Sequence, residues 1–257
     1  RSGTSTLASS LSSGEFYRTC VQEPYVLSSG SYKDFPDVLD VFKNNFAQET
    51  FRNTQSIKFN NADKIYKSLD FLYSKFNGIK HVYSSSNIFL NFHIISYCNN
   101  NNIKIIHQYR KNLLECSLSN WLIQQTNLSG YSKSNQEKID NFNFKPIPVT
   151  CVKNLAFRLF IQINEAKSLL DVSENLNFID IHKESLYSKD LKLRRILFNE
   201  ICEFLNIEFD KLDKSFLENY LFKDNTQYNK ESIYQKIPNY NEFLNLKNNQ
   251  IVKDMLT

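Results

Sequence analysis

The chain has 257 residues, a net charge of +4 and a hydrophobic fraction of 41%. These values are typical of a globular protein with a sizeable core and exclude a disordered chain, so we expect a single domain over residues 1–257. The charge is mild and spread along the sequence, and no run of eighteen apolar residues occurs, which argues against a nucleic-acid partner and against a membrane-spanning segment.

The turn-forming residues and the cysteines add further expectations. With only 5 Gly and 5 Pro, the chain has to build its loops from Asn, Ser and Asp. The 5 cysteines lie far apart and form no Cys-x-x-Cys pair, so the sequence predicts reduced thiols and neither a disulfide framework nor a zinc site. No ligand spacing indicates another metal, and no signal peptide is visible, which favours a cytoplasmic protein.

Hydrophobic spacing predicts helices and strands that alternate along the chain. Helices are expected at residues 5–13, 35–46, 61–76, 88–98, 112–126, 151–171 and 192–205, with short ones at 215–221, 239–246 and near 255. Strands are expected at residues 79–83, 103–109 and 178–182, and irregular segments at 14–33 and 130–148. This alternation predicts an α/β fold in which a central parallel sheet is flanked by helices and binds ligands at the carboxyl ends of its strands.

The first six residues form the stretch around which we expect the site to be organised. Small and hydroxyl-bearing residues before a helix suit a loop whose free N–H groups cradle a phosphate or a sulfate ester. The residues of this predicted anion cradle are Arg1, Ser2, Gly3, Thr4, Ser5 and Thr6. It is not a Walker loop, because no Gly-Lys-Ser/Thr occurs. An N-capped surface helix is the alternative. Because the chain starts without Met inside this motif, we expect a preceding strand to have been cut away.

A second stretch, K-I-I-H-Q-Y-R-K-N-L-L-E-C-S-L-S at residues 104–119, delivers an arginine at the end of a predicted strand. Arg110 ends the strand, and the following helix carries Ser119 nine residues later. A guanidinium and a hydroxyl that converge on one phosphate would bind it well. Spacing alone also fits a strand-end salt bridge for Arg110 and a plain helix-surface position for Ser119.

Together, the two stretches resemble the sulfotransferases that use 3′-phosphoadenosine 5′-phosphosulfate (PAPS), and they look most like the bacterial and cyanobacterial members. Residues 1–5 are similar to the family's 5′-phosphosulfate loop, and residues 104–119 are similar to its 3′-phosphate motif. Residues 181–186, 196–206 and 237–243 resemble further elements of the family. The resemblance implies a P-loop-like sulfotransferase fold without its first strand, and sulfuryl transfer from PAPS to a hydroxyl of a small molecule or glycan. We expect that acceptor to be a carbohydrate.

The resemblance also implies roles for individual residues. Residues 1–6 hold the phosphosulfate, and Arg1 stabilises the charge that grows on the leaving 5′-phosphate. Arg110 and Ser119 bind the 3′-phosphate, although the family's more usual spacing would select Lys111 instead of Arg110. Sulfuryl transfer passes through a loose in-line transition state, so positioning and charge stabilisation carry the catalysis and no metal is needed.

An acceptor hydroxyl needs a general base, for which the sequence offers three candidates. Glu23 is preferred, because family members place a glutamate at that distance after the loop. His81 follows Lys80 in a way that loosely resembles another branch of the family, and Glu15 has similar chemistry but lies closer to the loop. Lys80 is a candidate for contact with the sulfuryl group or the acceptor. Each position also fits a side chain without a catalytic role.

Two other function classes stay open. A P-loop nucleotide kinase or NTPase would also place a phosphate loop at a helix start, although the chain lacks Gly-Lys-Ser/Thr and a strand-end carboxylate for Mg²⁺. A non-catalytic domain that retains the sulfotransferase fold would keep the anion-binding stretches but lack a working base.

Overall fold

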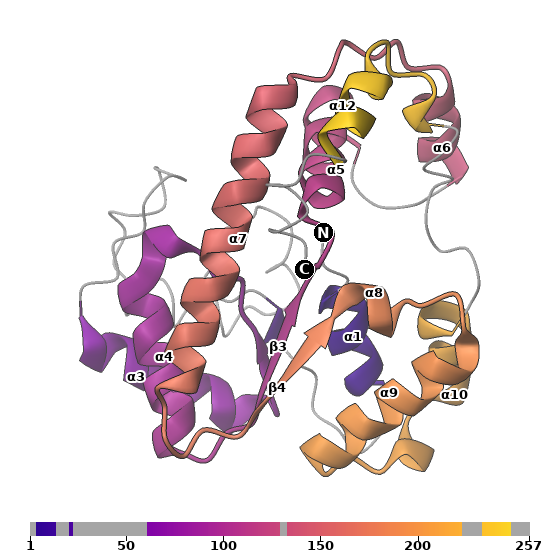
Figure 1. The fold of residues 1–257 in the computed structure, drawn as a ribbon. Helices are drawn as coiled ribbons and strands as arrows, with labels where there is room; N and C mark the ends of the chain where they lie inside the picture. Colours follow the sequence, from indigo (N-terminus) through magenta and orange to yellow (C-terminus); the bar gives the residue numbers. More distant parts are fainter. Residues whose placement is uncertain (1–3, 14–20, 23–60, 129–132, 223–232, 248–257) are drawn as a thin grey trace.

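The computed structural model describes residues 4–13, 21–22, 61–128, 133–222 and 233–247, and Figure 1 shows how their elements are arranged. The strands are β1 (Val21–Gln22), β2 (Ile79–Lys80), β3 (Ile105–Tyr109) and β4 (Phe178–His182). The α-helices are α1 (Thr4–Leu11), α3 (Ala62–Lys75), α4 (Ile88–Asn100), α5 (Leu113–Thr126), α6 (Lys133–Asp140), α7 (Val149–Asp171), α8 (Lys183–Leu186), α9 (Leu191–Leu205), α10 (Lys214–Phe216) and α12 (Tyr240–Lys247). Other helical turns are the 3₁₀ helices η1 (Ser85–Asn87) and η2 (Phe209–Lys211) and the π-helix η3 (Leu217–Leu221).

The described strands form two parallel pairs. Val21 of β1 lies opposite Ile79 of β2, and Ile105 of β3 lies opposite Phe178 of β4. Parallel strands need a long crossover connection, and α5, α6 and α7 supply it between β3 and β4. The structure therefore confirms the coarse prediction of helices combined with parallel strands.

Alternate residues of β3 and β4 pack on opposite faces. Ile105 packs against a core formed by α3 and α4, whereas Ile106 packs against a core formed by α1, α9 and η3. In β4, Ile179 and Ile181 belong to this second core. Figure 1 accordingly shows α3, α4 and α7 on one side of the strands and α1, α8, α9 and α10 on the other. The strands β3 and β4 are thus the middle of three layers.

A third core, which we call the upper core, lies beyond the carboxyl end of β3. Its buried side chains come from α5, α6, the first half of α7 and the C-terminal segment, and they include Leu114, Trp121, Val152 and Phe243. At the top of Figure 1, α12 lies next to α5, and α7 runs from this region down to the strands. The upper core therefore holds α5 in place just after the end of β3.

Three predicted segments differ from the observed ones. The strand expected at residues 79–83 is shorter and comprises β2 alone. The segments expected to be irregular contain β1 and α6. The polar α6 is attached to the upper core through the buried Ile139, which hydrophobic spacing does not reveal as a helical anchor. The helices predicted at residues 35–46 and near Met255 lie outside the described residues.

Asparagine supports the left-handed turns, as the scarcity of glycine predicts. In the described part of the chain, the non-glycine residues with positive φ are Asn102, Asn127 and Asn206, with φ of 53°, 53° and 60°. Asparagine tolerates this region better than other residues with a Cβ atom. Asn127 and Asn206 each end a long helix, α5 and α9.

The thiol prediction is confirmed for the cysteines that the structure describes. Cys98, Cys116, Cys151 and Cys202 are all free. Burial raises the pKa of Cys98 to about 11 and that of Cys202 to about 12, so both are inert structural thiols. Among the described helices, none combines the length and the hydropathy that crossing a membrane requires.

Candidate functional site

The turn from β3 into α5 places Arg110 at the carboxyl edge of the strands. Arg110 directly follows Tyr109, the last residue of β3, and is half-buried. Asn112 caps α5, because its side chain accepts a hydrogen bond from the Glu115 N–H at 3.0 Å and donates one to the Glu115 carboxylate at 3.2 Å. This reciprocal cap fixes the start of α5 and thereby the position of Ser119 on its second turn.

Glu184 fastens this turn to the end of the neighbouring strand. Its carboxylate accepts hydrogen bonds from the Lys111 N–H at 3.1 Å and from the Asn112 N–H at 3.3 Å. Glu184 belongs to α8, which directly follows β4. The ends of β3 and β4 are therefore tied together beside Arg110. The sequence resemblance includes this glutamate but assigns it no role.

Ser119 and Arg110 both influence the hydroxyl of Tyr234. Tyr234 comes from the C-terminal segment, is 5% exposed, and stacks its ring on that of Tyr240 in the upper core. Burial raises the pKa of its hydroxyl, and Glu115 raises it further, whereas Ser119 and Arg110 act in the opposite direction. Ser119 acts on this hydroxyl through a side-chain hydrogen bond, and Arg110 acts on it through its charge. Sequence reasoning missed Tyr234, because no motif links it to α5.

Lys111 has different surroundings from those of Arg110. Its side chain is exposed. The pKa of His182, the last residue of β4, is lowered first by burial and then by the charge of Lys111. Lys111 therefore acts on the end of β4, whereas Arg110 acts on the hydroxyl of Tyr234, as Ser119 does. This difference favours Arg110 over Lys111 as the partner of Ser119, a choice that sequence spacing leaves open.

Part of the predicted anion cradle falls in the described chain. Arg1, Ser2 and Gly3 lie outside the described residues. Thr4, Ser5 and Thr6 form the first turn of α1. Leu7, the next residue, is buried in the same core as Ile181 of β4 and Leu186 of α8. Helix α1 is therefore packed beside the end of β4, and Figure 1 shows it next to α8.

The candidate bases follow β1 and β2. Glu15 and Glu23 lie outside the described residues. Gln22, the residue before Glu23, pairs with Lys80, the residue before His81. The two strands are parallel, so they run in the same direction up to this pair of residues.

A buried asparagine holds His81. The His81 Nε2 lies 2.8 Å from the Asn91 Oδ1, and the Asn91 amide donates to the Ser84 carbonyl at 2.9 Å. Because an amide oxygen only accepts, this contact places the proton of a neutral imidazole on Nε2 and the lone pair on Nδ1. The contact satisfies His81 structurally, and it also selects a tautomer in which Nδ1 has the character of a base.

A row of polar side chains across β3 and β4 was not predicted. His107 and Asp180 lie opposite each other in the register, with 2.7 Å between Nδ1 and Oδ1. Lys167 of α7 reaches the other Asp180 oxygen at 3.3 Å and lies over the Tyr109 ring, 4.7 Å from its centroid. The row fastens α7 across the strands. Its signal in the sequence is the polar residues at alternate positions of both strands.

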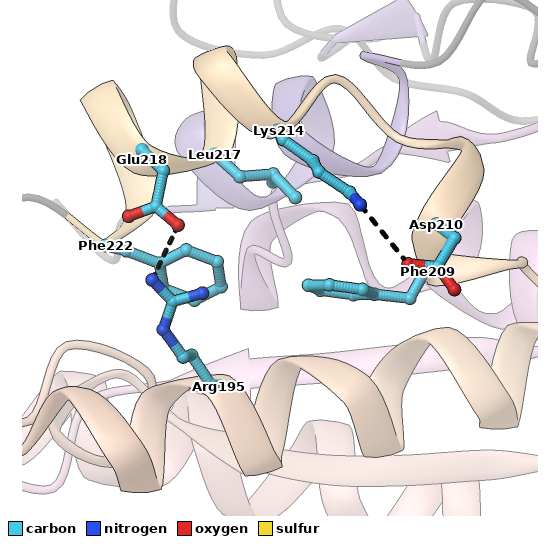
Figure 2. Close-up of a pocket in the computed structure, with 7 residues that line it drawn as sticks. All are labelled: Arg195, Phe209, Asp210, Lys214, Leu217, Glu218 and Phe222. Atoms are coloured by element: carbon cyan, nitrogen blue, oxygen red, sulfur yellow. Dashed lines mark hydrogen bonds and ion pairs between the residues drawn. The ribbon is translucent and has the colours of Figure 1, made fainter.

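A pocket of about 230 Å³ lies between α9 and the segment from η2 to η3 (Figure 2). Its lining residues are Arg195, Phe209, Asp210, Lys214, Leu217, Glu218 and Phe222. Arg195 pairs with Glu218 at 2.5 Å, and Lys214 pairs with Asp210 at 3.6 Å. Because each cation already faces a carboxylate, the pocket offers no excess positive charge to a phosphate-bearing ligand. None of the predicted site residues lines it.

Within the described residues, no group of three or more His, Cys, Asp or Glu side chains is placed to hold a metal ion. No known protein family, curated protein or solved structure matches the chain. Function is therefore inferred from the residues and their geometry.

Proposed function

We propose that the chain is a sulfotransferase of the P-loop type, which moves a sulfuryl group from PAPS to an acceptor hydroxyl of a carbohydrate. The donor carries a 5′-phosphosulfate and a 3′-phosphate, so its site needs two separate anion grips. In this proposal, residues 1–6 form the first grip, and Arg110 with Ser119 forms the second.

The observation that supports the proposal is that Ser119 and the charge of Arg110 both act on one buried hydroxyl, that of Tyr234. The two residues come from a strand end and from the second turn of the helix that follows it. A guanidinium beside a hydroxyl suits a phosphate monoester, because the fork of donors on arginine matches the phosphate oxygens.

The packing of α1 supports the first grip. Leu7 shares a core with Ile181 and Leu186, so α1 lies by the end of β4, the strand that pairs with β3. Ligands of parallel sheets bind at the carboxyl ends of the strands, where helix N-termini attract anions. This placement is compatible with two anion grips at one edge of the sheet.

The proposed chemistry needs few groups. Charge grows on the oxygen that bridges sulfur and the 5′-phosphate, and Arg1 would stabilise it as that bond breaks. Glu23 would accept the proton of the acceptor hydroxyl as the oxygen attacks sulfur in line. His81 is the alternative base, and its bond to Asn91 leaves Nδ1 as the basic nitrogen. Gln22 and Lys80, the residues before the two candidates in the sequence, pair with each other in the register of β1 and β2.

Isothermal titration with adenosine 3′,5′-bisphosphate, the desulfated donor, tests this proposal. We expect the 257-residue chain to bind it more tightly than ATP, and we expect Arg110→Ala with Ser119→Ala to weaken binding at least tenfold. Lys111→Ala is the matched control, because it removes a neighbouring charge that faces β4 instead. Equal binding by the double variant would contradict the proposal. Tighter binding of ATP would favour a nucleotide kinase or NTPase.

A further inference from the structure

The pocket between α9 and the segment from η2 to η3 is shaped by the π-helix η3. At the end of η3, the Phe222 N–H donates to the Leu217 carbonyl, five residues earlier, at 2.8 Å. Side chains five residues apart lie about 140° apart around an α-helix, whereas a π turn brings them much closer to the same side. Leu217 and Phe222 accordingly both line the pocket. Because π turns are rare and frequent at functional sites, this turn marks the pocket as a candidate binding site.

Two aromatic rings form walls of the pocket and share one support. Figure 2 shows Phe222 on one side and Phe209 on the other, with Leu217 above them. The fully buried Phe198 contacts both rings edge-on, with centroid distances of 5.9 Å to Phe209 and 6.0 Å to Phe222. The Arg195 guanidinium lies over the Phe222 ring, 4.4 Å from its centroid. These walls are in place before a ligand arrives, and they suit an apolar or aromatic group.

The two ion pairs at the rim of the pocket differ in their closeness. Arg195 and Glu218 lie 2.5 Å apart and share a hydrogen bond. Lys214 and Asp210 lie 3.6 Å apart, which is too long for a hydrogen bond, and both side chains are largely exposed. Such an exposed pair contributes little to stability, so a ligand can replace it at small cost. The looser pair thus offers an ammonium and a carboxylate side by side.

A ligand that complements this pocket carries both charges and an apolar group. Its carboxylate would bind Lys214, its ammonium would bind Asp210, and its apolar group would lie between the two rings. Free α-amino acids combine these features, whereas a residue inside a peptide chain has lost both charges. The volume of about 230 Å³ admits an aromatic side chain, since cavities of about 150 Å³ hold benzene.

We infer that this pocket binds a free α-amino acid with an aromatic side chain. The inference is independent of the proposed function, because none of the predicted site residues lines the pocket. The ring of the ligand enters between Phe209 and Phe222 and leaves water, which is favourable. The charged head group stays at the rim with Lys214 and Asp210, so the charges of ligand and pocket balance.

A ligand-observed NMR titration with L-phenylalanine tests the inference. We expect the 257-residue chain to bind it with a Kd of about 1 mM or lower, which is ordinary for a ligand of this size. Glycine keeps the charges without the ring, and N-acetyl-L-phenylalaninamide keeps the ring without the charges. Both should bind at least about tenfold more weakly. Equally tight binding of either probe, or no binding of L-phenylalanine at about 10 mM, overturns the inference.

Two exchanges at the rim show whether the amino acid binds in this pocket. Lys214→Met removes one charge and keeps the stem of the side chain, and Asp210→Asn removes the other charge. Because both side chains are largely exposed, neither exchange should affect folding. Each should raise the Kd for L-phenylalanine about threefold to tenfold, since a charged hydrogen bond at an exposed position is lost.

Lys211→Met is the matched control for these exchanges. Lys211 belongs to η2, pairs with Glu208 and does not line the pocket. Its exchange should change the Kd less than about twofold. Binding that neither rim exchange weakens, or that Lys211→Met weakens equally, places the site elsewhere and overturns the inference. The titration with the bisphosphate does not depend on these results, so the proposed function is judged separately.

Discussion

At the scale of single residues, Glu184 shows how a carboxylate far along the chain from Arg110 positions the turn that carries this arginine. It accepts hydrogen bonds from the backbone of Lys111 and Asn112, the two residues that follow Arg110. These bonds connect the end of β3 to α8 at the end of β4. Glu184 touches neither Arg110 nor Ser119 through these bonds, so we regard it as a positioning residue.

Glu184→Ala should weaken binding of adenosine 3′,5′-bisphosphate about threefold to tenfold, because the turn that carries Arg110 loses two hydrogen bonds. Glu184→Gln should restore part of the affinity, since its amide oxygen still accepts one of them. Isothermal titration is done with the bisphosphate and with adenosine 5′-phosphate, which lacks the 3′-phosphate. A loss of affinity for the bisphosphate alone shows that the effect arises at the 3′-phosphate. Glu208→Ala, which removes an exposed carboxylate that precedes η2 and pairs with Lys211, is the control. Equal affinity of Glu184→Ala and wild-type chains would exclude this role.

The site could be predicted from sequence only where a motif was contiguous. Arg110 and Ser119 lie in one continuous strand-to-helix stretch, the end of β3 and the start of α5, which is the arrangement that the sequence predicts. Tyr234 reaches them from a distant segment, and local spacing carries no information on which segment packs against α5. The same limit applies to Glu184, whose partners are backbone N–H groups and therefore leave no trace in side-chain pattern.

At the scale of elements, helices with strong apolar periodicity were predictable and short or polar elements were not. The predicted helices at residues 61–76 and 192–205 match α3 and α9 closely, because a buried stripe of side chains determines them. The two residues of β1 form a strand only through their pairing with β2, which is a non-local contact. Local sequence therefore could not have revealed β1.

The end of α9 illustrates the use of asparagine where other proteins use glycine. Asn206 has φ of 60° and ψ of 37°, and the following Ile207 N–H donates to the Cys202 carbonyl at 2.8 Å. A side chain with a Cβ atom is strained in this conformation, and glycine is not. Asparagine lies between these extremes, because its short polar side chain tolerates the left-handed region.

Asn206→Ala should lower the free energy of unfolding by about 1 kcal/mol, whereas Asn206→Gly should leave it unchanged or raise it by a few tenths, as measured by urea denaturation. Asn199→Ala is the matched control, because it makes the same substitution inside α9, where alanine has the higher helix propensity. It should be neutral or stabilising. Similar effects of the two alanine variants would show that backbone strain at Asn206 is not the cause.

At the scale of the whole molecule, α7 connects the upper core to the strands. Its first half contributes Val152 and Ala156 to the upper core. Its second half is bonded to residues near both strand pairs. Ser85, which follows β2, donates a hydrogen bond to Glu165, and Lys167 forms an ion pair with Asp180 of β4. Figure 1 shows the helix spanning this length. A single long helix thus sets the position of the Tyr234 region relative to the carboxyl ends of the strands.

His182 lies where these parts meet, and its ring should make the stability of the whole chain depend on pH. Burial lowers its pKa most, and its Nδ1 has no hydrogen-bond partner among the described residues. The charged groups that face it are Lys111 from the β3–α5 turn, Glu184 from α8, Lys167 from α7 and Asp180 from β4. The two lysines lower the pKa, and the two carboxylates raise it.

Because the pKa of His182 lies below 6.5 in the folded chain, the unfolded chain takes up this proton first as the pH falls. The stability that the neutral ring contributes is therefore complete above pH 6.5 and is lost progressively between that pH and the lowered pKa of the folded state. We expect urea denaturation to show a smaller free energy of unfolding at pH 5.0 than at pH 7.5. His182→Gln should reduce this difference, because glutamine does not titrate. His93→Gln is the control, because the ring of His93 contacts the Tyr66 hydroxyl on α3. This variant should keep the full difference in free energy of unfolding between the two pH values. If His182→Gln retains the full difference, the pH dependence has another origin, and the junction of β3, β4 and α7 does not sense the charge of this ring.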